Sequence, residues 1–398
     1  MLKPLTAFRA SIQSNLHMNF KRIIDTIKSY DFKSLDFRLI FFVIALSCLG
    51  IAVISSAASE SMARKQVLGL IAGIIIMLVV SLIKYEFIIR YYWLLYVVNF
   101  LMLLSVKLFG VTWLGAQRWI AIGNFQFQPS ELSKLLIIIF LAALCATNNQ
   151  TIDSWKFFFF ALIVFAIPLA LIMLEPDLST SIVIICIFCA IIFVSGLSIR
   201  IIKRVLTVIV PLAVVFIALI FILPADKNII PEYQYNRLVG FYDKDNEVAA
   251  RIRYQQENAV TAIAGGGLTG KGLNNDSPTS VKNANFISEP ETDFIFTIIG
   301  EELGFVGTVA TLLLISLIVF ECLRIGYRAR EQVGRSIAVG YGTMIAIQSF
   351  INIGVNTMII PNTGLTLPFV SYGLSSLITS FIGIGIVLNV GLRKKISF

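Results

Sequence analysis

Residues 287–304, which read ISEPETDFIFTIIGEELG, carry five carboxylates at the edge of an apolar stretch. They are Glu289, Glu291, Asp293, Glu301 and Glu302. Charge is costly in an apolar environment, so ionisable groups at such a place indicate a functional site. Desolvation and neighbouring acids raise a carboxylate's pKa and improve it as a general base, whereas nearby cations lower that pKa. The segment therefore predicts acid–base chemistry.

Residues 115–134, GAQRWIAIGNFQFQPSELSK, bring basic and acidic side chains together. Arg118 stands beside Trp119, so it is either an interfacial anchor or a clamp for phosphate. Glu131 and Lys134 are three residues apart at the head of a predicted helix, where they share one face and can form an ion pair. Such a pair serves either a substrate or the packing of the helix.

The segment EPDLSTS at 175–181 lies where two apolar runs meet. Asp177 directly precedes a helix expected to start near Leu178, so its carboxylate is either the N-cap of that helix or part of a site. Both alternatives place an acid at the same edge of the apolar region as Arg118.

The glycine-rich stretch GGGLTGKGL at 265–273 resembles a nucleotide-binding loop in its first seven positions. The eighth position requires Ser or Thr to hold the metal ion, and here it is Gly272. No nucleotide is therefore expected, although glycine-rich backbone together with Lys271 could cradle a phosphate.

The residue inventory excludes several chemistries. The only histidine is His17, near the N-terminus, which excludes a histidine zinc site and a Ser-His-Asp triad. Carboxylates, lysine, arginine and hydroxyl groups remain. These suit acid–base chemistry on a phosphate-bearing substrate, with Mg²⁺ or Mn²⁺ as a candidate cofactor whose site the sequence does not give.

The composition determines what must position these groups. Of the 398 residues, 57% are hydrophobic and 14% are charged, whereas a soluble domain carries about 25% charged residues. We therefore predict an all-α polytopic membrane protein. About ten runs are long enough to span a bilayer, namely 37–58, 66–84, 91–109, 129–147, 155–174, 178–197, 205–223, 295–322, 336–359 and 369–392.

The basic residues indicate the orientation. With the N-terminus inside, the inner segments hold 20 of the 32 Lys and Arg residues, and the outer ones hold five besides the seven in segment 224–294. Excess positive charge marks the cytoplasmic side, so both termini are predicted to be cytoplasmic. The net charge of +9 is thus a feature of membrane orientation, and no nucleic-acid partner is expected.

The predicted domain organisation follows from these spans. Residues 1–36 form a basic cytoplasmic segment that lacks a signal peptide, with an interfacial helix over 19–33. Residues 37–392 form the transmembrane domain, with a large extracytoplasmic loop at 224–294 between the seventh and eighth helices. Residues 393–398 form a cytoplasmic tail.

Six motifs in order give a resemblance to a known family: GAQRWI, QPSELSK, EPDLST, GGLTGKG, TDFIFTIIGEELG and PNTGLTLPFVSYGLSS. Over residues 36–392 the chain resembles the SEDS family (shape, elongation, division and sporulation), which comprises the RodA, FtsW and SpoVE proteins of bacterial wall synthesis. GAQRW and EPD are more similar to the RodA branch, which implies a role in cell elongation and shape.

The resemblance implies a peptidoglycan glycosyltransferase that polymerises lipid II at the outer face of the inner membrane. It also implies a class B penicillin-binding protein, a transpeptidase, as partner. The family's essential acid maps onto Asp293, and Arg118, Glu131, Lys134 and Asp177 match other functional positions of the family.

Combined with the residues themselves, the resemblance suggests an inverting reaction. Asp293 would act as general base on the acceptor sugar, while Arg118, Lys134 and Lys271, with a divalent ion, would stabilise the leaving diphosphate. Glu302 would orient a partner group, and Ser371 is a further substrate-binding candidate.

Two alternatives stay open beside this reading. A lipid II flippase could use the same charged cavity, but transport predicts polar groups that continue to the cytoplasmic side. A non-catalytic scaffold for a transpeptidase would need the helices and not Asp293.

Overall fold

The computed structural model describes residues 35–113, 116–123, 125–223, 235, 237–238, 241–242, 247–275, 278, 280 and 287–393. The predicted interfacial helix over 19–33 lies outside the described residues, as do most of the C-terminal tail and part of the loop over 224–294.

The expected all-α polytopic fold is confirmed, because a helix occupies each of the predicted spans. These are α2 (Phe37–Ala57), α3 (Glu60–Ser81), α5 (Tyr92–Phe109), α6 (Pro129–Thr147), α7 (Trp155–Leu174), α8 (Leu178–Val194), α9 (Ile199–Ile222), α13 (Ile295–Arg328), α14 (Gln332–Asn356) and α15 (Leu374–Leu392). Within the described part of the chain, nine of them are long and apolar enough to cross a membrane, and α8 has 17 residues.

The boundaries differ from expectation where side chains cap a helix or where the chain turns. α3 begins at Glu60 rather than 66, because the Ser59 side chain accepts a hydrogen bond from Met62 N and starts the helix within a polar segment. α15 begins at Leu374 rather than 369, because Phe369 is left-handed (φ 65°) and the residues after it form a turn.

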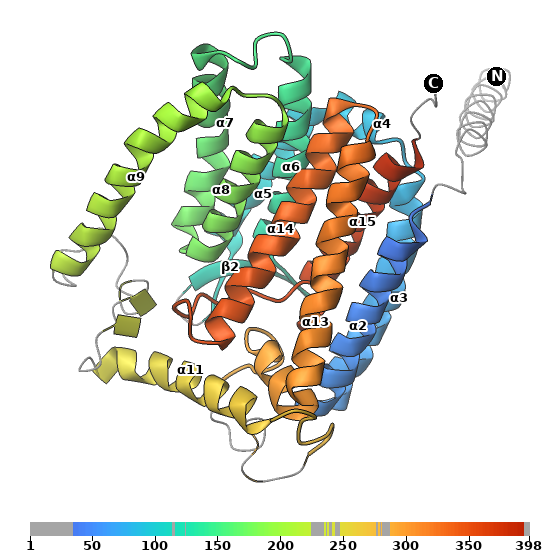
Figure 1. Cartoon of the computed structure of the whole chain (residues 1–398), viewed down its shortest axis with the longest axis vertical. Coiled ribbons are helices and arrows are strands. Elements are labelled where there is room, and N and C mark those ends of the chain that lie inside the picture. The colour runs from blue at the N-terminus through green and yellow to red at the C-terminus, as the bar shows by residue number, and fades with distance from the viewer. Residues whose placement is uncertain are drawn as a thin grey trace, which may run out of the picture.

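The helices pack into a bundle around α6 and α14 (Figure 1). α14 contacts α6, α8, α13 and α15, and α6 is buried along almost its whole length. Helix α9, in contrast, is mostly exposed. Only Ile201 and Ile220 are buried in it, and it stands apart from the bundle in Figure 1, so its apolar surface suits contact with lipid.

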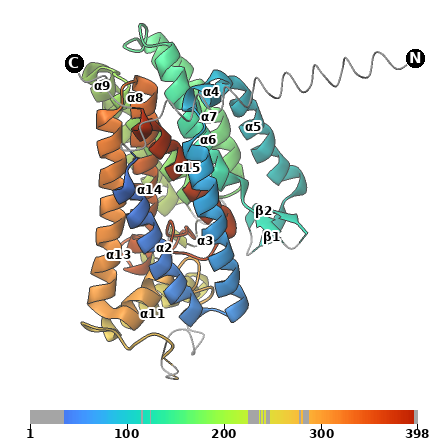
Figure 2. The same ribbon diagram turned by 90° about the vertical axis from the view of Figure 1, so that its right-hand side faces the viewer.

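The start of the first of these helices and the end of the last one lie at the same end of the bundle. α2 begins and α15 ends at the end of the bundle opposite α11 (Glu247–Gly265), as Figures 1 and 2 show. Ion pairs hold this end, since Asp36 pairs with Arg324 and Glu86 pairs with Arg393. The two ends of the described chain thus share one side of the bundle, and the prediction that this side is cytoplasmic stays a prediction.

The described part of the chain also contains a sheet, a short helix and a loop helix outside the predicted spans. A small antiparallel sheet joins α5 to α6 and consists of β1 (Val111–Trp113), β2 (Ala116–Ile122) and β3 (Phe125–Phe127), in the order β1-β2-β3. A short helix, α4 (Tyr85–Arg90), precedes α5. Helix α11 lies within the large loop, at the same end of the molecule as the sheet (Figure 1).

Helix α13 is two helical parts rather than the single span predicted over 295–322. Gly304 has φ 63° and ψ −157°, a conformation essentially restricted to glycine, and it divides residues 295–303 from 305–328. A Cβ atom at Gly304 would lie 2.3 Å from the backbone nitrogen of Gly270. The glycine-rich stretch thus docks against the bend, where Phe305 N donates to Gly267 O over 2.9 Å.

Candidate functional site

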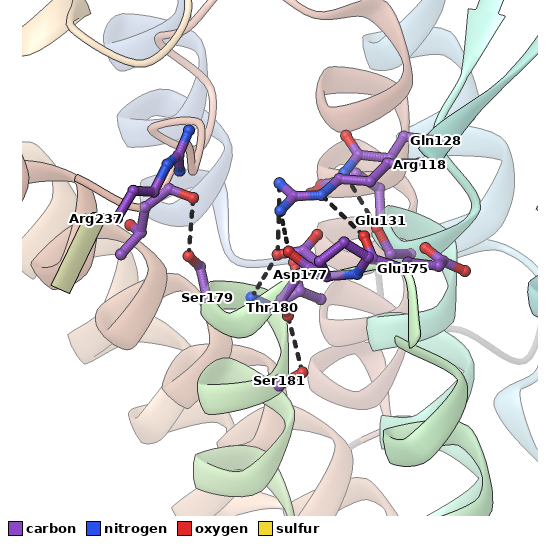
Figure 3. A network of polar contacts seen from close by, with 12 residues as sticks. Arg118, Gln128, Glu131, Glu175, Asp177, Ser179, Thr180, Ser181 and Arg237 are labelled. Carbon is purple, nitrogen blue, oxygen red and sulfur yellow. Dashed lines mark hydrogen bonds and ion pairs between the residues drawn. The ribbon is translucent and has the colours of Figure 1, made fainter. Parts of the chain in front are cut away.

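Arg118 links the sheet to the junction of α7 and α8. Its Nε donates to the backbone oxygen of Glu175 over 3.3 Å, and Nη2 donates to the backbone oxygen of Pro176. Its Nη1 lies 3.9 Å from Oδ1 of Asp177 (Figure 3). Arg118 is therefore part of a folded site and not only an interfacial anchor.

Asp177 has both of the roles that its position suggested as alternatives. Its Oδ1 accepts a hydrogen bond of 3.1 Å from Thr180 N, which makes it the N-cap of α8. The same carboxylate faces Arg118, and only 2% of the residue is exposed. An aspartate at a helix N-terminus is stabilised by the backbone amides, so the pair is fixed in place.

Glu175 is an acid of this junction that the sequence reasoning did not single out. It is buried, and neither carboxyl oxygen has a hydrogen-bond partner in the described part of the chain. Burial, followed by the charge of Asp177, raises the pKa of Glu175 to about 8, although Arg118 opposes the shift. At neutral pH this group is mostly a neutral acid.

Asp293 lies just before α13 and is held by its backbone. Its carbonyl oxygen accepts hydrogen bonds of 2.9 Å from the side-chain amides of both Asn352 and Asn356 on α14. This arrangement places its carboxylate at the same end of the bundle as Arg118 and Asp177, whose charges both act on it.

The charge environment of Asp293 sets its basicity. Burial, the largest cause, raises the pKa of Asp293 to about 6. The cations Arg237 and Arg118 oppose that shift, whereas Glu289 and Asp177 add to it. A carboxylate with a pKa of about 6 is ionised at neutral pH and is a better base than an exposed aspartate.

Arg237 is a second residue that the sequence reasoning missed. Its Nη1 donates to Asn362 O over 3.4 Å, beside the left-handed Gly364 (φ 70°). A Cβ atom at Gly364 would lie 3.2 Å from Oδ2 of Asp293 and 3.5 Å from Nη1 of Arg237. Glycine at this position therefore leaves room for the acid and the cation to approach each other. No motif marked Arg237, because it is one of many charges in the long loop.

Glu131 and Lys134 form the expected ion pair inside the bundle. Lys134 Nζ lies 2.8 Å from Glu131 Oε1 and donates over 2.7 Å to Oε1 of Gln348 on α14. Lys134 is only 1% exposed. A lysine at that depth needs such partners, so the pair has a packing role whatever it does for a substrate.

Gln348 belongs to a row of amides that the sequence analysis passed over. Gln348, Asn352 and Asn356 are spaced four residues apart on α14, and all are buried. Polar residues at that spacing in an apolar helix are a signal that could have been read from the sequence.

Lys271 and Glu302 belong to a different cluster. Lys271 Nζ lies 2.7 Å from Glu301 Oε1, and Glu302 Oε1 accepts a 2.5 Å hydrogen bond from Ser56 on α2. The glycines near Lys271 serve close backbone packing, since Cβ atoms at Gly266 and Gly270 would lie 1.9 and 2.1 Å from the oxygens of Gly300 and Glu302. These contacts tie Lys271 to α13 and not to Arg118.

Ser371 lies beside the segment that carries Asp293. Its hydroxyl donates to Thr292 O over 2.7 Å and accepts from Leu367 N over 2.7 Å. Tyr372 N also donates to Glu291 O over 2.9 Å. Ser371 thus binds the late loop to the residues just before the acid.

Carboxylates near Asp293 are the natural ligands for the candidate Mg²⁺ or Mn²⁺ ion. In the described part of the chain, no group of three or more His, Cys, Asp or Glu side chains could hold a metal ion. Asp177 and Asp293 supply too few oxygens for a protein-only Mg²⁺ or Mn²⁺ site. The residues that the structure describes thus do not form a site for a resident ion, and the divalent cation expected from the sequence stays a prediction.

Comparison with known proteins gives consistent results. A family profile described as "Cell cycle protein", covering FtsW, RodA and SpoVE, matches residues 33–396. Stage V sporulation protein E of Bacillus subtilis (strain 168) is 34% identical over 373 residues, which cover 89% of this chain and 96% of that protein. A probable peptidoglycan glycosyltransferase FtsW of Geobacter metallireducens is 30% identical over 404 residues, which cover 96% of this chain and 99% of that protein.

Two solved structures share the fold. One, from work titled "Structural coordination of polymerization and crosslinking by a peptidoglycan synthase complex", is 26% identical, with a TM-score of 0.74 over 93% of this chain and 99% of that chain. The other, the rod shape determining protein RodA of Thermus thermophilus, is 26% identical, with a TM-score of 0.64 over 91% and 97%.

Proposed function

Because this chain belongs to the FtsW/RodA/SpoVE family, we propose that it is a peptidoglycan glycosyltransferase that polymerises lipid II into glycan strands. The reaction takes place at the outer face of the inner membrane, where the lipid-linked sugars of donor and acceptor lie in water. The observation that carries the proposal is the position of Asp293, a carboxylate with a raised pKa among the charges of Arg237, Arg118 and Asp177.

The reaction follows from these groups. A hydroxyl of the acceptor sugar attacks the anomeric carbon of the donor, and its proton passes to the carboxylate of Asp293. The new glycosidic bond forms as the bond from the anomeric carbon to the phosphate oxygen breaks, and the electron pair leaves with the lipid diphosphate. Attack from the face opposite the diphosphate inverts the anomeric carbon.

The leaving diphosphate is a developing negative charge that needs nearby cations. Arg118 is the cation expected from the sequence for this role, and Arg237 is the cation with the largest electrostatic effect on Asp293. Lys134 is buried and bonded to Glu131 and Gln348, so in this proposal it acts through its charge and by orienting its neighbours. A Mg²⁺ or Mn²⁺ ion would enter with the substrate's phosphates.

The biological setting is also part of the proposal. A multi-pass protein with both termini in the cytoplasm would present the Asp293 end of the bundle outward. A class B penicillin-binding protein would cross-link the strands that this chain makes. The GAQRW and EPD motifs favour cell elongation, whereas the two relatives named above are a stage V sporulation protein and an FtsW protein.

The direct experiment is chain assembly from labelled lipid II by the purified protein, with and without its transpeptidase partner and with and without EDTA. Glycan strands longer than the disaccharide are expected with the partner present, and loss of product in EDTA would support a divalent cation. Transbilayer movement of lipid II without any polymer would instead establish the flippase alternative, and neither activity would favour the scaffold.

A further inference from the structure

Three buried amides form a continuous row on one face of α14. Gln348 is 2% exposed, Asn352 is 1% exposed and Asn356 is not exposed. Residues four apart on a helix lie above one another on one face. An amide buried without hydrogen bonds is costly, so the partners of each amide show what the row is for.

The two asparagines converge on the acid of the site. Asn352 Nδ2 donates to Asp293 O over 2.9 Å and to Leu365 O over 2.6 Å. Asn356 Nδ2 donates to the same Asp293 oxygen over 2.9 Å. Its Oδ1 accepts from the backbone nitrogen and the hydroxyl of Thr297, over 3.0 and 2.7 Å. One carbonyl therefore receives two donors, and the first turn of α13 is fixed as well.

Gln348 extends the row toward the buried ion pair. Its Oε1 accepts from Lys134 Nζ over 2.7 Å, and its Nε2 donates to Thr366 O over 3.0 Å. Residues 365 and 366 are neighbours, so Gln348 and Asn352 hold the same short stretch of the late loop. The row thus connects Lys134 on α6 with Asp293 through one helix face.

We propose that Gln348, Asn352 and Asn356 are positioning residues for catalysis, which aim the Asp293 carboxylate and link it to the Lys134–Glu131 pair. The inference rests on the proposed function. None of the three amides needs to touch the substrate. Two donors on the carbonyl of residue 293 hold the peptide plane that carries its side chain, and a displacement of about 1 Å at a reacting group can cost on the order of 100-fold in rate.

A purely structural role for the amides is the alternative, and the chain offers a matched control. Asn389 on α15 is also fully buried, and its Nδ2 donates to Ser81 O over 2.6 Å while its Oδ1 accepts from Tyr85 N over 3.0 Å. It joins membrane helices in the same way, but at the opposite end of the bundle from Asp293. A substitution of Asn389 has comparable packing consequences and lacks the connection to the site.

The first test compares Asn352→Leu with Asn389→Leu in glycan assembly per mole of folded protein, as a function of lipid II concentration and pH. If the amides position Asp293, kcat of Asn352→Leu should fall about 10- to 100-fold while KM changes less than about twofold. The acid limb of its pH profile, where the rate rises with pH, should also shift. Asn389→Leu keeps the wild-type kcat and limb. Equal kcat values and limbs for the two variants would overturn the inference.

A second variant guards against misfolding. Asn352→Asp keeps the shape of the side chain but replaces the donating amide by a carboxylate beside Asp293, which raises the pKa of that acid. The acid limb should move to higher pH. An unmoved limb in folded Asn352→Asp would contradict the proposal, whereas an inactive wild-type protein would contradict the proposed function instead.

A readout that needs no activity completes the test. Asp293→Cys is reacted with a membrane-impermeant maleimide in the otherwise native full-length chain and again with Asn352→Leu or Asn389→Leu added. Positioning predicts a severalfold change of labelling rate at residue 293 with Asn352→Leu and none with Asn389→Leu. Identical rates in all three proteins would show that Asn352 does not aim this residue.

Discussion

Two carboxyl groups with raised pKa values lie at the same end of the bundle, and their environments give them different pKa values. Asp293 has a pKa of about 6, and Glu175 has a pKa of about 8. At neutral pH the first is mostly ionised and can accept a proton, while the second is mostly protonated. Environments that give two neighbouring acids different pKa values are a recurrent feature of acid–base sites.

The pH dependence of the reaction should report Asp293. A general base works only when deprotonated, so the rate should rise with pH through about 6 and then level off. Arg237→Gln removes a cation that favours the carboxylate and should move this limb to higher pH. Glu289→Gln removes an acid that disfavours the carboxylate and should move it to lower pH.

Initial rates of glycan assembly, measured from about pH 5 to about pH 8 so that the range brackets the pKa of Asp293, check both shifts. Asp153→Asn is the control, because Asp153 is an exposed acid whose carboxylate accepts from Ser198 N at the opposite end of the bundle. Shifts of one sign for both Arg237→Gln and Glu289→Gln would contradict the assignment.

The buried ion pair makes a separate prediction about stability. Lys134→Met leaves the carboxylate of Glu131, which is 6% exposed, without its cation and should cost about 3–5 kcal/mol. The double variant Lys134→Met/Glu131→Gln should recover part of that loss, because no unpaired charge remains. Reversible unfolding in detergent measures both. A single variant as stable as the wild type would contradict the packing role of the pair.

The acids and cations that lie in sequence motifs were predicted as site residues. Residues that only the folding of the chain brings to the site were not predicted. Arg118, Asp177 and Asp293 come together as expected. Arg237 was not foreseen, because only the path of the long loop brings it to Gly364. Lys271 was predicted as a possible phosphate ligand because of its glycines, and this role stays a prediction; the structure shows that those glycines pack closely against the backbone of α13.

At the scale of elements, the bend in α13 separates a short helical part near Asp293 from the long helix. The part over 295–303 begins two residues after Asp293, and Gly304 then redirects the chain into the long helix. Hydropathy predicted one span here, because an apolar run has the same composition whether it is straight or bent. Similarly, β1–β3 were not expected, because strands of three to seven residues give little periodic signal.

Gly304→Ala should therefore destabilise the protein by about 1–3 kcal/mol, since Ala is strained at this backbone conformation. The added Cβ would also meet the backbone of Gly270 at 2.3 Å. Gly391→Ala in α15 is the control, since its Cβ would make only ordinary contacts of 3.6 Å or more, with Ile325 of α13. Detergent unfolding of both variants is the measurement, and equal stabilities would contradict the strain argument.

At the scale of the whole molecule, the bundle has two ends of different character. One end carries the sheet and α11, and the other carries the start of α2 and the end of α15 (Figures 1 and 2). Arg118 lies in β2 of that sheet, and the charge of Arg118 acts on Asp293. The count of Lys and Arg predicts that the second end faces the cytoplasm. Ten apolar helices were predictable, because their length and composition are local properties.

Cysteine labelling checks the orientation. Glu289→Cys is exposed beside Asp293, and Asn149→Cys is exposed in the turn between α6 and α7 at the other end. A membrane-impermeant maleimide applied from outside should label the first in intact cells, with the outer membrane permeabilised where there is one, and the second only after the inner membrane is opened. The reverse pattern would place the acid in the cytoplasm, away from the proposed substrate.

The most direct measurement is glycan assembly from lipid II by purified Asp293→Asn, in parallel with the wild type and with Glu291→Gln. The asparagine keeps the size of the side chain and the backbone contacts but cannot accept the proton. We expect a folded protein that makes no glycan, beside wild-type and Glu291→Gln proteins that do. Polymerisation by Asp293→Asn at the wild-type rate would show that this carboxylate is not the base.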